Sequence, residues 1–329
     1  MLSENVESPG LWPRYLRLNE SMPIRSMGIK AVLKLFVDRT ARTRLGWRFY
    51  RGCGRLSQYL AKVYGHARFV RATRDQDEKL ARLVKELFPT LTVAHGPFQG
   101  MRYPAAESFG SMILPKLLGS YESELHPTLE ALLINDYTAI VDIGCAEGYY
   151  AVGLGLRFPA ANVFAFDTSP KARQMCAEMA ALNGLESRVQ IGNFCDAEAL
   201  KSLPLGEKAL IISDCEGYEN VLFNRELAAF LVQHDLIVEA HDFIDIETSP
   251  NLRRVFAQSH KVEIISSTDD IEKAHAYQFA ELDRYSTGER FTILGERRPG
   301  IMKWLVLTAQ TQGSTTAQQM AKARGEGIA

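Results

Sequence analysis

Hydrophobic residues recur along the middle of the chain in short runs, and longer amphipathic stretches separate these runs. The short runs predict strands at residues 138–143, 162–167, 187–192, 208–213 and 236–241. The stretches between and after them predict helices at residues 147–158, 169–183, 196–203, 218–232 and 249–257. Strands that alternate with helices form parallel βαβ units with right-handed crossovers. The pattern therefore predicts an α/β fold with a doubly wound, mostly parallel sheet.

Two further apolar runs, at residues 261–267 and 301–308, follow the last of these helices. A polar insertion that includes Tyr285 to Pro299 separates them, and no helix is predicted directly before the second run. That run can therefore pair antiparallel with its neighbour. Together with the five runs above, the two runs predict a seven-stranded sheet whose last strand is antiparallel.

The part of the chain before the sheet has a different pattern. Residues 1–26 contain three prolines and little periodicity, which predicts irregular structure. Apolar residues recur at helical spacing near 27–37, 56–63 and 75–88, and alternation around two glycines predicts a β-hairpin near 91–103. The predicted divisions are a basic, mainly helical region at 1–90, a hairpin and helical lead-in at 91–136, a sheet domain at 137–309 and a flexible tail at 310–329.

The first strand of the predicted sheet ends in a glycine turn that suits a nucleoside. Asp142, Gly144 and Gly148 form the pattern D-x-G-x-x-x-G, and the next strand ends at Asp167. Glycine permits backbone angles that are closed to other residues, and an acid at the end of the second strand can accept hydrogen bonds from a ribose diol. The turn lacks the middle glycine of G-x-G-x-x-G, so it favours a nucleoside without a pyrophosphate over a dinucleotide.

Four motifs in this order, VDIGCAEGYYAVGL, FAFD, ISDCEGYE and IVEAHDF, resemble those of the FkbM-type methyltransferases. This is a mostly bacterial family within the class I S-adenosylmethionine-dependent methyltransferases, and most of its members are assigned to O-methylation. The resemblance covers roughly residues 91–308 and implies S-adenosylmethionine as the cofactor.

The resemblance also implies a set of cofactor-binding residues. Asp142 would orient the methionine amino group, Asp167 would bind the ribose, and Asp196 would meet the adenine amino group. Helix capping is the alternative for Asp167 and Asp196, which both precede predicted helices, and bonding to turn amides is the alternative for Asp142. The full set is Asp142, Gly144, Gly148, Asp167, Phe194, Asp196, Tyr121 and Glu122.

Further acids lie at the ends of the fourth and fifth predicted strands. Asp214 and Glu216 follow the fourth strand, and Glu239 and His241 share one face of the fifth. Methyl transfer requires alignment of the acceptor with the methyl carbon and can require a base. We predict His241 as the general base, because its ordinary pKa lies near 6.5, and Asp214 with Glu216 as positioning groups. A hydrogen-bonded structural histidine is the alternative for His241.

A divalent metal is possible at these strand ends but is not favoured. Carboxylates and imidazole are ligands for Mg²⁺ or a transition ion. Adjacent strand ends, however, gather acids without any metal. The predicted metal ligands are therefore none.

Charge is distributed unevenly along the chain. Residues 14–72 contain fourteen Lys or Arg and two acids, although the whole chain has a net charge of −1. This segment predicts contact with an anionic membrane or partner, and a solvated face packed on an acidic domain is the alternative. Nucleic acid is the least favoured partner, because no aromatic residues are interleaved in the way that reads bases.

Five cysteines without a C-x-x-C pair, and the absence of a secretory pattern, predict a cytoplasmic protein. The predicted function is S-adenosylmethionine-dependent O-methylation of a small-molecule or carbohydrate hydroxyl. A nicotinamide-dependent oxidoreductase and a non-catalytic cofactor-binding protein are the alternatives. The arginines of the polar insertion would bind an acidic group of the acceptor or form solvated surface; they are Arg284, Arg290, Arg297 and Arg298.

Overall fold

The computed structural model describes residues 29–310 and divides into two compact units. One unit ends at Asp75 and the other begins at Gln76. Residues 1–26, predicted to be irregular, and nearly all of the predicted tail at 310–329 lie outside the described residues.

Two helices account for the described chain up to residue 87. They are α1, Ile29–Ala41, and α2, Arg44–Leu87, and the boundary between the two units falls inside α2. The separate helices predicted near 56–63 and 75–88 are parts of this one helix, which contains no proline and ends two residues before Pro89. No helix among the described residues combines the length and the apolar character needed to cross a bilayer.

The second unit contains a seven-stranded sheet with the order β3-β2-β1-β4-β5-β7-β6. Strands β1 to β5 are parallel, and β7 pairs antiparallel with both β5 and β6. The predicted doubly wound, mostly parallel fold with an antiparallel last strand is confirmed. The strands are β1 Ala139–Ile143, β2 Asn162–Phe166, β3 Val189–Gly192, β4 Ala209–Ser213, β5 Asp235–Ala240, β6 His260–Ser266 and β7 Lys303–Ala309.

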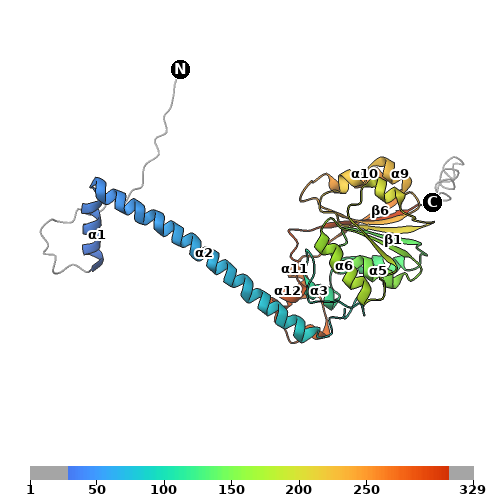
Figure 1. Ribbon diagram of the computed structural model, residues 1–329, viewed down its shortest axis with the longest axis horizontal. Coiled ribbons are helices and arrows are strands. Elements are labelled where there is room, and N and C mark those ends of the chain that lie inside the picture. Colours follow the sequence, from blue (N-terminus) through green and yellow to red (C-terminus); the bar gives the residue numbers. More distant parts are fainter. Residues whose placement is uncertain (1–28, 311–329) are drawn as a thin grey trace, which may run out of the picture. The chain divides into compact units, whose positions relative to one another are not determined.

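Helices cover both faces of this sheet (Figure 1). Alternate residues of β1 serve the two faces: Ile140 joins the core that includes Val152 of α5, and Val141 joins the core that includes Leu227 of α9. A strand covered on both faces is apolar along its whole length, which is why these runs are hydrophobic rather than alternating. The helices between the strands are α5 Tyr149–Arg157, α6 Pro170–Leu182, α7 Ala197–Ser202, α8 Glu219–Leu222, α9 Arg225–Phe230 and α10 Thr248–Phe256.

The remaining helices belong to two segments of the chain, one before β1 and one between β6 and β7. They are α3 Ile113–Leu118, η2 Ser123–Leu125 and α4 His126–Leu132 before β1, and α11 Asp270–Ala276, η3 Ala280–Leu282 and α12 Thr287–Leu294 before β7. The predicted polar insertion therefore has helical structure of its own.

Two local predictions differ from the structure. The segment 91–103 forms one isolated bridge, Thr92 to Arg102, rather than a hairpin, because Ala94 leaves the pairing and donates to the carbonyl of Leu117 at 2.8 Å. The predicted helix at 218–232 is split into α8 and α9, because Asn224 accepts from the Leu227 amide at 2.9 Å and begins a new helix.

Candidate active site

A cavity of about 550 Å³ lies at the carboxyl ends of β1, β2, β4 and β5. In a doubly wound sheet, ligands bind at this edge, where the order of the strands reverses. Nine of the predicted site residues line the cavity: Tyr121, Glu122, Asp142, Gly144, Asp167, Phe194, Asp214, Glu216 and His241. The other two, Gly148 and Asp196, do not line it.

Gly144 brings the ends of β1 and β4 into contact. Its φ of 88° lies in the left-handed region, and a Cβ at this position would lie 1.7 Å from the carbonyl oxygen of Asp214. Only glycine fits this position. Gly148 also has a left-handed φ, of 96°, and a Cβ there would lie 2.9 Å from the sulfur of Cys176 in α6. Gly148 therefore permits α5 to pack closely on α6.

Asp142 and Asp167 hold the turn from two sides. Asp142 is buried and accepts from the Ala151 amide of α5 at 2.8 Å, and burial raises the pKa of its carboxyl to about 7. Asp167 accepts from the amides of Ala146 at 3.0 Å and Ser169 at 2.7 Å. Each carboxylate oxygen can accept a second bond, so both acids retain capacity for a ligand.

A buried ion pair beside the turn was not predicted from the sequence. Glu147 accepts from Lys116 Nζ at 2.6 Å and from the Phe109 amide at 3.1 Å. Burial opposes ionisation of Glu147, but the charge of Lys116 and these hydrogen bonds keep its pKa below the ordinary value. Glu147 therefore connects the glycine turn to α3 through Lys116 and to the segment before α3 through Phe109. The signal in the sequence was an acid inside an otherwise apolar turn, at Cys145-Ala146-Glu147.

Phe194 lies in the lining of the cavity, whereas Asp196 lies outside it. Phe194 is half exposed, lines the cavity and lies 5.3 Å from the Tyr218 ring, measured between centroids. Asp196 is exposed and accepts from the Ala199 amide at 2.8 Å, as the N-cap of α7. The geometry at Asp196 therefore matches the capping alternative.

His241 is surrounded by carboxylates. Its Nδ1 lies 2.6 Å from Glu219, which is fully buried, and its Nε2 lies 3.4 Å from both Asp214 and Glu216. Burial opposes charge on the ring, but the bonds to Glu216 and Glu219 and the charge of Asp214 raise the pKa of His241 to about 10. In this arrangement His241 holds a proton at neutral pH.

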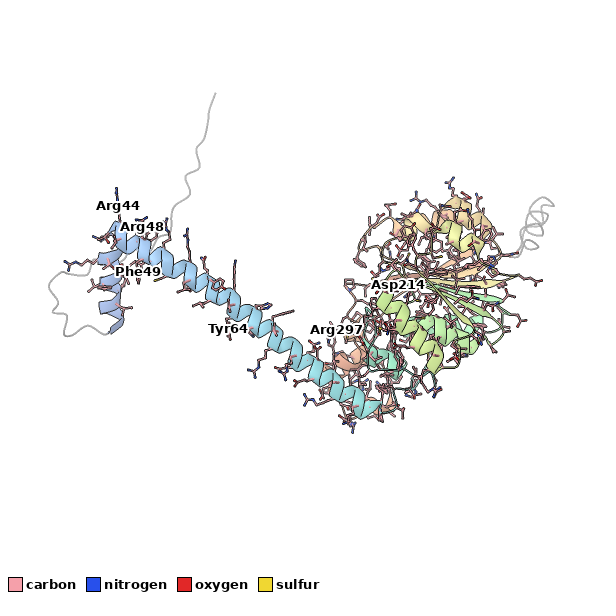
Figure 2. The ribbon with its side chains drawn as sticks, viewed as in Figure 1. Arg44, Arg48, Phe49, Tyr64, Asp214 and Arg297 are labelled. Atoms are coloured by element: carbon pink, nitrogen blue, oxygen red, sulfur yellow. The ribbon has the colours of Figure 1, made fainter. Side chains whose placement is uncertain are left out.

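Asp214 presents part of its carboxylate to the cavity. Its side chain is 33% exposed at the end of β4 (Figure 2), while Oδ1 is buried, accepts no hydrogen bond among the described residues and lies 3.4 Å from Nε2 of His241. Burial raises the pKa of Asp214 to about 6, against the opposing effect of His241. This carboxylate can therefore accept a proton close to neutral pH.

The same three residues could hold a metal ion. Ligand atoms of Asp214, Glu216 and His241 all lie within 4.8 Å of one another. The other two acids that end these strands are engaged elsewhere, since Glu239 accepts from Arg298 and Asp242 accepts from Lys303 at 2.7 Å. Three ligands from the protein are fewer than Mg²⁺ or Ca²⁺ requires without water or an acceptor oxygen.

Arg298 connects three acids in the wall of the cavity. It donates to Glu122, to Glu239 and, at 2.9 Å, to Glu296. Burial raises the pKa of Glu122 to about 7 and that of Glu239 to about 8, although Arg298 opposes both shifts. Arg298, whose side chain is 14% exposed, thus pairs with three buried carboxylates and is not solvated surface.

The other arginines of the insertion differ from Arg298. Arg297 is exposed and lines the cavity. Arg284 is exposed and pairs with Glu86 at 2.6 Å, and Arg290 donates to the Ala274 carbonyl at 2.9 Å. Only Arg297 and Arg298 of these four reach the cavity, whose lining holds seven carboxylates and three Lys or Arg.

No family model matches the chain. Over 99 residues it is 33% identical to a ribosomal protein L11 methyltransferase from Alkalilimnicola ehrlichii, a match that covers 28% of this chain and 33% of the relative. Over 69 residues it is 38% identical to a release factor glutamine methyltransferase from Deinococcus radiodurans, which covers 21% of this chain and 25% of the relative. The chain therefore spans only a quarter to a third of the length of these curated relatives.

Both relatives are methyltransferases by name, which supports the predicted methyltransferase family at this coarse level. The FkbM type stays a prediction. Among solved structures, the chain is similar to a precorrin-6y C5,15-methyltransferase from Geobacter metallireducens, with 11% identity and a TM-score of 0.37, over 56% of this chain and 88% of the other. At that score the likeness adds nothing to the strand order observed directly.

Proposed function

We propose that this protein is an S-adenosylmethionine-dependent methyltransferase that acts on a hydroxyl oxygen, of the FkbM type. The observation that carries the proposal is the cavity at the carboxyl edge of the sheet, which is lined by Asp142, Asp167, Phe194 and Asp214. The antiparallel β7 and the absence of a middle glycine disfavour the nicotinamide alternative.

The residues present fit such a cofactor. Asp167 has spare acceptor capacity for a ribose diol, and Phe194 offers an exposed ring face for adenine. Asp142 and the other carboxylates of the lining favour a cationic group. The cofactor would supply an activated methyl group, so the protein has to bind it, orient the acceptor and manage one proton.

The proton chemistry favours Asp214 over His241 as the base. An acceptor hydroxyl must lose its proton as its oxygen is methylated. Asp214 is partly exposed and lines the cavity, and its Oδ1 accepts no hydrogen bond among the described residues. His241 is only 3% exposed and already carries a proton, so we assign it the role of fixing Asp214 and Glu216. This replaces the general base that the sequence alone suggested.

The acceptor is proposed to be a small molecule or a carbohydrate. The cavity opens beside Arg297 and Phe243, which are exposed and belong to loops rather than to the sheet. Loops that form the entrance are the parts that set the acceptor in a fold of this kind.

Isothermal titration calorimetry with S-adenosylhomocysteine tests the proposal. We expect binding by the full chain and a loss of at least tenfold in Asp167→Ala, about 1.4 kcal/mol, because the ribose diol loses its acceptor. Glu186→Ala, which removes an exposed acid that does not line the cavity, serves as the matched control and should bind as the wild type does. Absence of binding at millimolar ligand would refute the assignment.

A further inference from the structure

The first unit carries a helical surface that no described residue covers. In α2, Leu45 and Phe49 are 82% and 66% exposed, and three further apolar residues along the helix are about half exposed. These three are Leu56, Leu60 and Val63. Large apolar side chains that recur on one helix in this way mark an interaction surface, whereas single exposed ones do not.

These five residues form one stripe, while Trp47 and Phe69, which are 58% and 68% exposed, lie on other sides of α2. From Leu45 to Val63 the five follow at steps of four, seven, four and three residues. Steps of three, four and seven keep side chains on one side of an α-helix. The stripe therefore runs along α2 as a continuous face.

A basic stripe lies directly beside it. Its residues follow at steps of four, three, four and seven, and four of the five stand one position before a residue of the apolar stripe; they are Arg44, Arg48, Arg51, Arg55 and Lys62. One position corresponds to about 100° around the helix, so the two stripes are neighbours. Figure 2 shows Arg44, Arg48 and Phe49 projecting from the first turns of α2. We call the two stripes together the α2 docking face.

The charge of this segment has a single sign. From Arg44 to Arg71 the chain contains seven Lys or Arg and no Asp or Glu. A second copy of the helix laid against the apolar stripe would bring like charges together along the whole contact. Nucleic acid would satisfy the arginines but would leave the apolar stripe in water. An anionic lipid surface satisfies both, because its headgroups attract the basic stripe and its acyl boundary takes up the apolar one.

We propose that the α2 docking face binds the protein to an anionic lipid surface, with this part of α2 lying in the plane of the interface. The segment from Arg44 to Arg71 is 28 residues long, which corresponds to about 42 Å of helix. This inference does not depend on the proposed methyl transfer, because it rests on residues of the first unit alone.

Co-sedimentation of the full chain with vesicles tests the inference. We expect binding to phosphatidylcholine vesicles that contain about one third phosphatidylserine, weaker binding as salt is raised, and little binding to phosphatidylcholine alone. The triple variant Arg48→Gln/Arg51→Gln/Arg55→Gln should bind roughly 100-fold more weakly. The double variant Phe49→Ser/Leu60→Ser should also lose most binding, because the stripe loses two of its largest members.

A matched control separates position from net charge. Arg225→Gln/Arg253→Gln/Lys261→Gln makes the same charge change at exposed sites of the second unit and should bind as the wild type does. Failure of the wild type to bind anionic vesicles, or an equal loss in this control, would overturn the inference. Sedimentation velocity without lipid covers the competing occupant: a dimer that Phe49→Ser/Leu60→Ser dissociates, with no vesicle binding, would assign the face to a second copy. If duplex RNA displaced the protein from vesicles, and the Phe49→Ser/Leu60→Ser variant bound vesicles as well as the wild type does, the α2 docking face would be assigned to nucleic acid.

Discussion

Replacing Arg298 with methionine would remove one cation from three buried carboxylates at once. The side chains of Glu122, Glu239 and Glu296 are 2%, 3% and 1% exposed, so water cannot take the place of the guanidinium. Breaking a buried ion pair from one side costs about 3–5 kcal/mol of unfolding free energy. Glu296 keeps its second partner, Lys273, so the loss falls mainly on Glu122 and Glu239.

The cost of Arg298→Met should depend on pH. The pKa values of Glu122 and Glu239 are already raised to about 7 and about 8, and loss of Arg298 raises them further. A carboxyl whose folded pKa is raised binds its proton more tightly when folded, so stability falls as pH rises from the unfolded value toward the folded one. Near pH 6 both acids of the variant are protonated. The loss of unfolding free energy should then fall to about 1 kcal/mol, which is the contribution of the lost hydrogen bonds. Near pH 8.5 it should approach about 3–5 kcal/mol.

Urea denaturation followed by circular dichroism at the two pH values measures this difference. Arg254→Met is the matched control, because Arg254 is exposed and its contact with Glu247 is 3.4 Å long. The control should change stability by no more than about 0.5 kcal/mol at either pH. An Arg298→Met cost that is equal at the two pH values, or as small as that of the control, would refute the electrostatic reading of this cluster.

Three further predictions concern single positions. Asp196→Ala should lower the unfolding free energy by about 1 kcal/mol through loss of the α7 cap, and leave the calorimetric affinity for S-adenosylhomocysteine unchanged; a tenfold loss of affinity would restore its adenine role. Gly144→Ala should cost more than about 3 kcal/mol in urea denaturation, because its Cβ meets backbone, whereas Gly184→Ala, with φ of 73° and open space, should cost about 1 kcal/mol; equal costs would contradict the close approach. In a nuclear magnetic resonance titration His241 should stay protonated up to about pH 10, while His260, whose pKa is lowered by burial, should titrate below about 6.5; a His241 midpoint near 6.5 would return it to the role of base.

The sheet could be predicted from the sequence because its signal is local. The central strands β1, β4 and β5 are short apolar runs that are buried at every position. The glycine turn was equally accessible, since Gly144 and Asp167 sit at fixed places relative to those runs. The prediction of a hairpin at 91–103 was wrong. Alternation of apolar residues does not reveal the competing hydrogen bond that Ala94 donates to Leu117, a residue of α3.

The role of Arg298 could not be read from the sequence. It follows Arg297 and precedes Pro299, and such a charged run next to a proline is typical of exposed loops. Its burial depends on Glu122, which is 176 residues earlier in the chain, and on Glu239, which is 59 residues earlier. No local pattern carries that information. The protonation of His241 could not be predicted for the same reason, because Glu219, which bonds its Nδ1, lies in a different element, α8.

The acid-rich lining of the cavity links ligand binding to protons. Seven carboxylates line it, and the pKa values of Asp142, Asp214, Glu122 and Glu239 are raised to between about 6 and about 8. A sulfonium that enters such a site lowers these pKa values and expels protons, whereas its neutral thioether product lacks the charge to do so. Once the methyl group had been transferred, these carboxylates would bind protons again, and the neutral product would be bound less tightly. Acidification of the medium on binding of S-adenosylmethionine, absent with S-adenosylhomocysteine, would be the signature of a site that releases its spent cofactor by recovering protons.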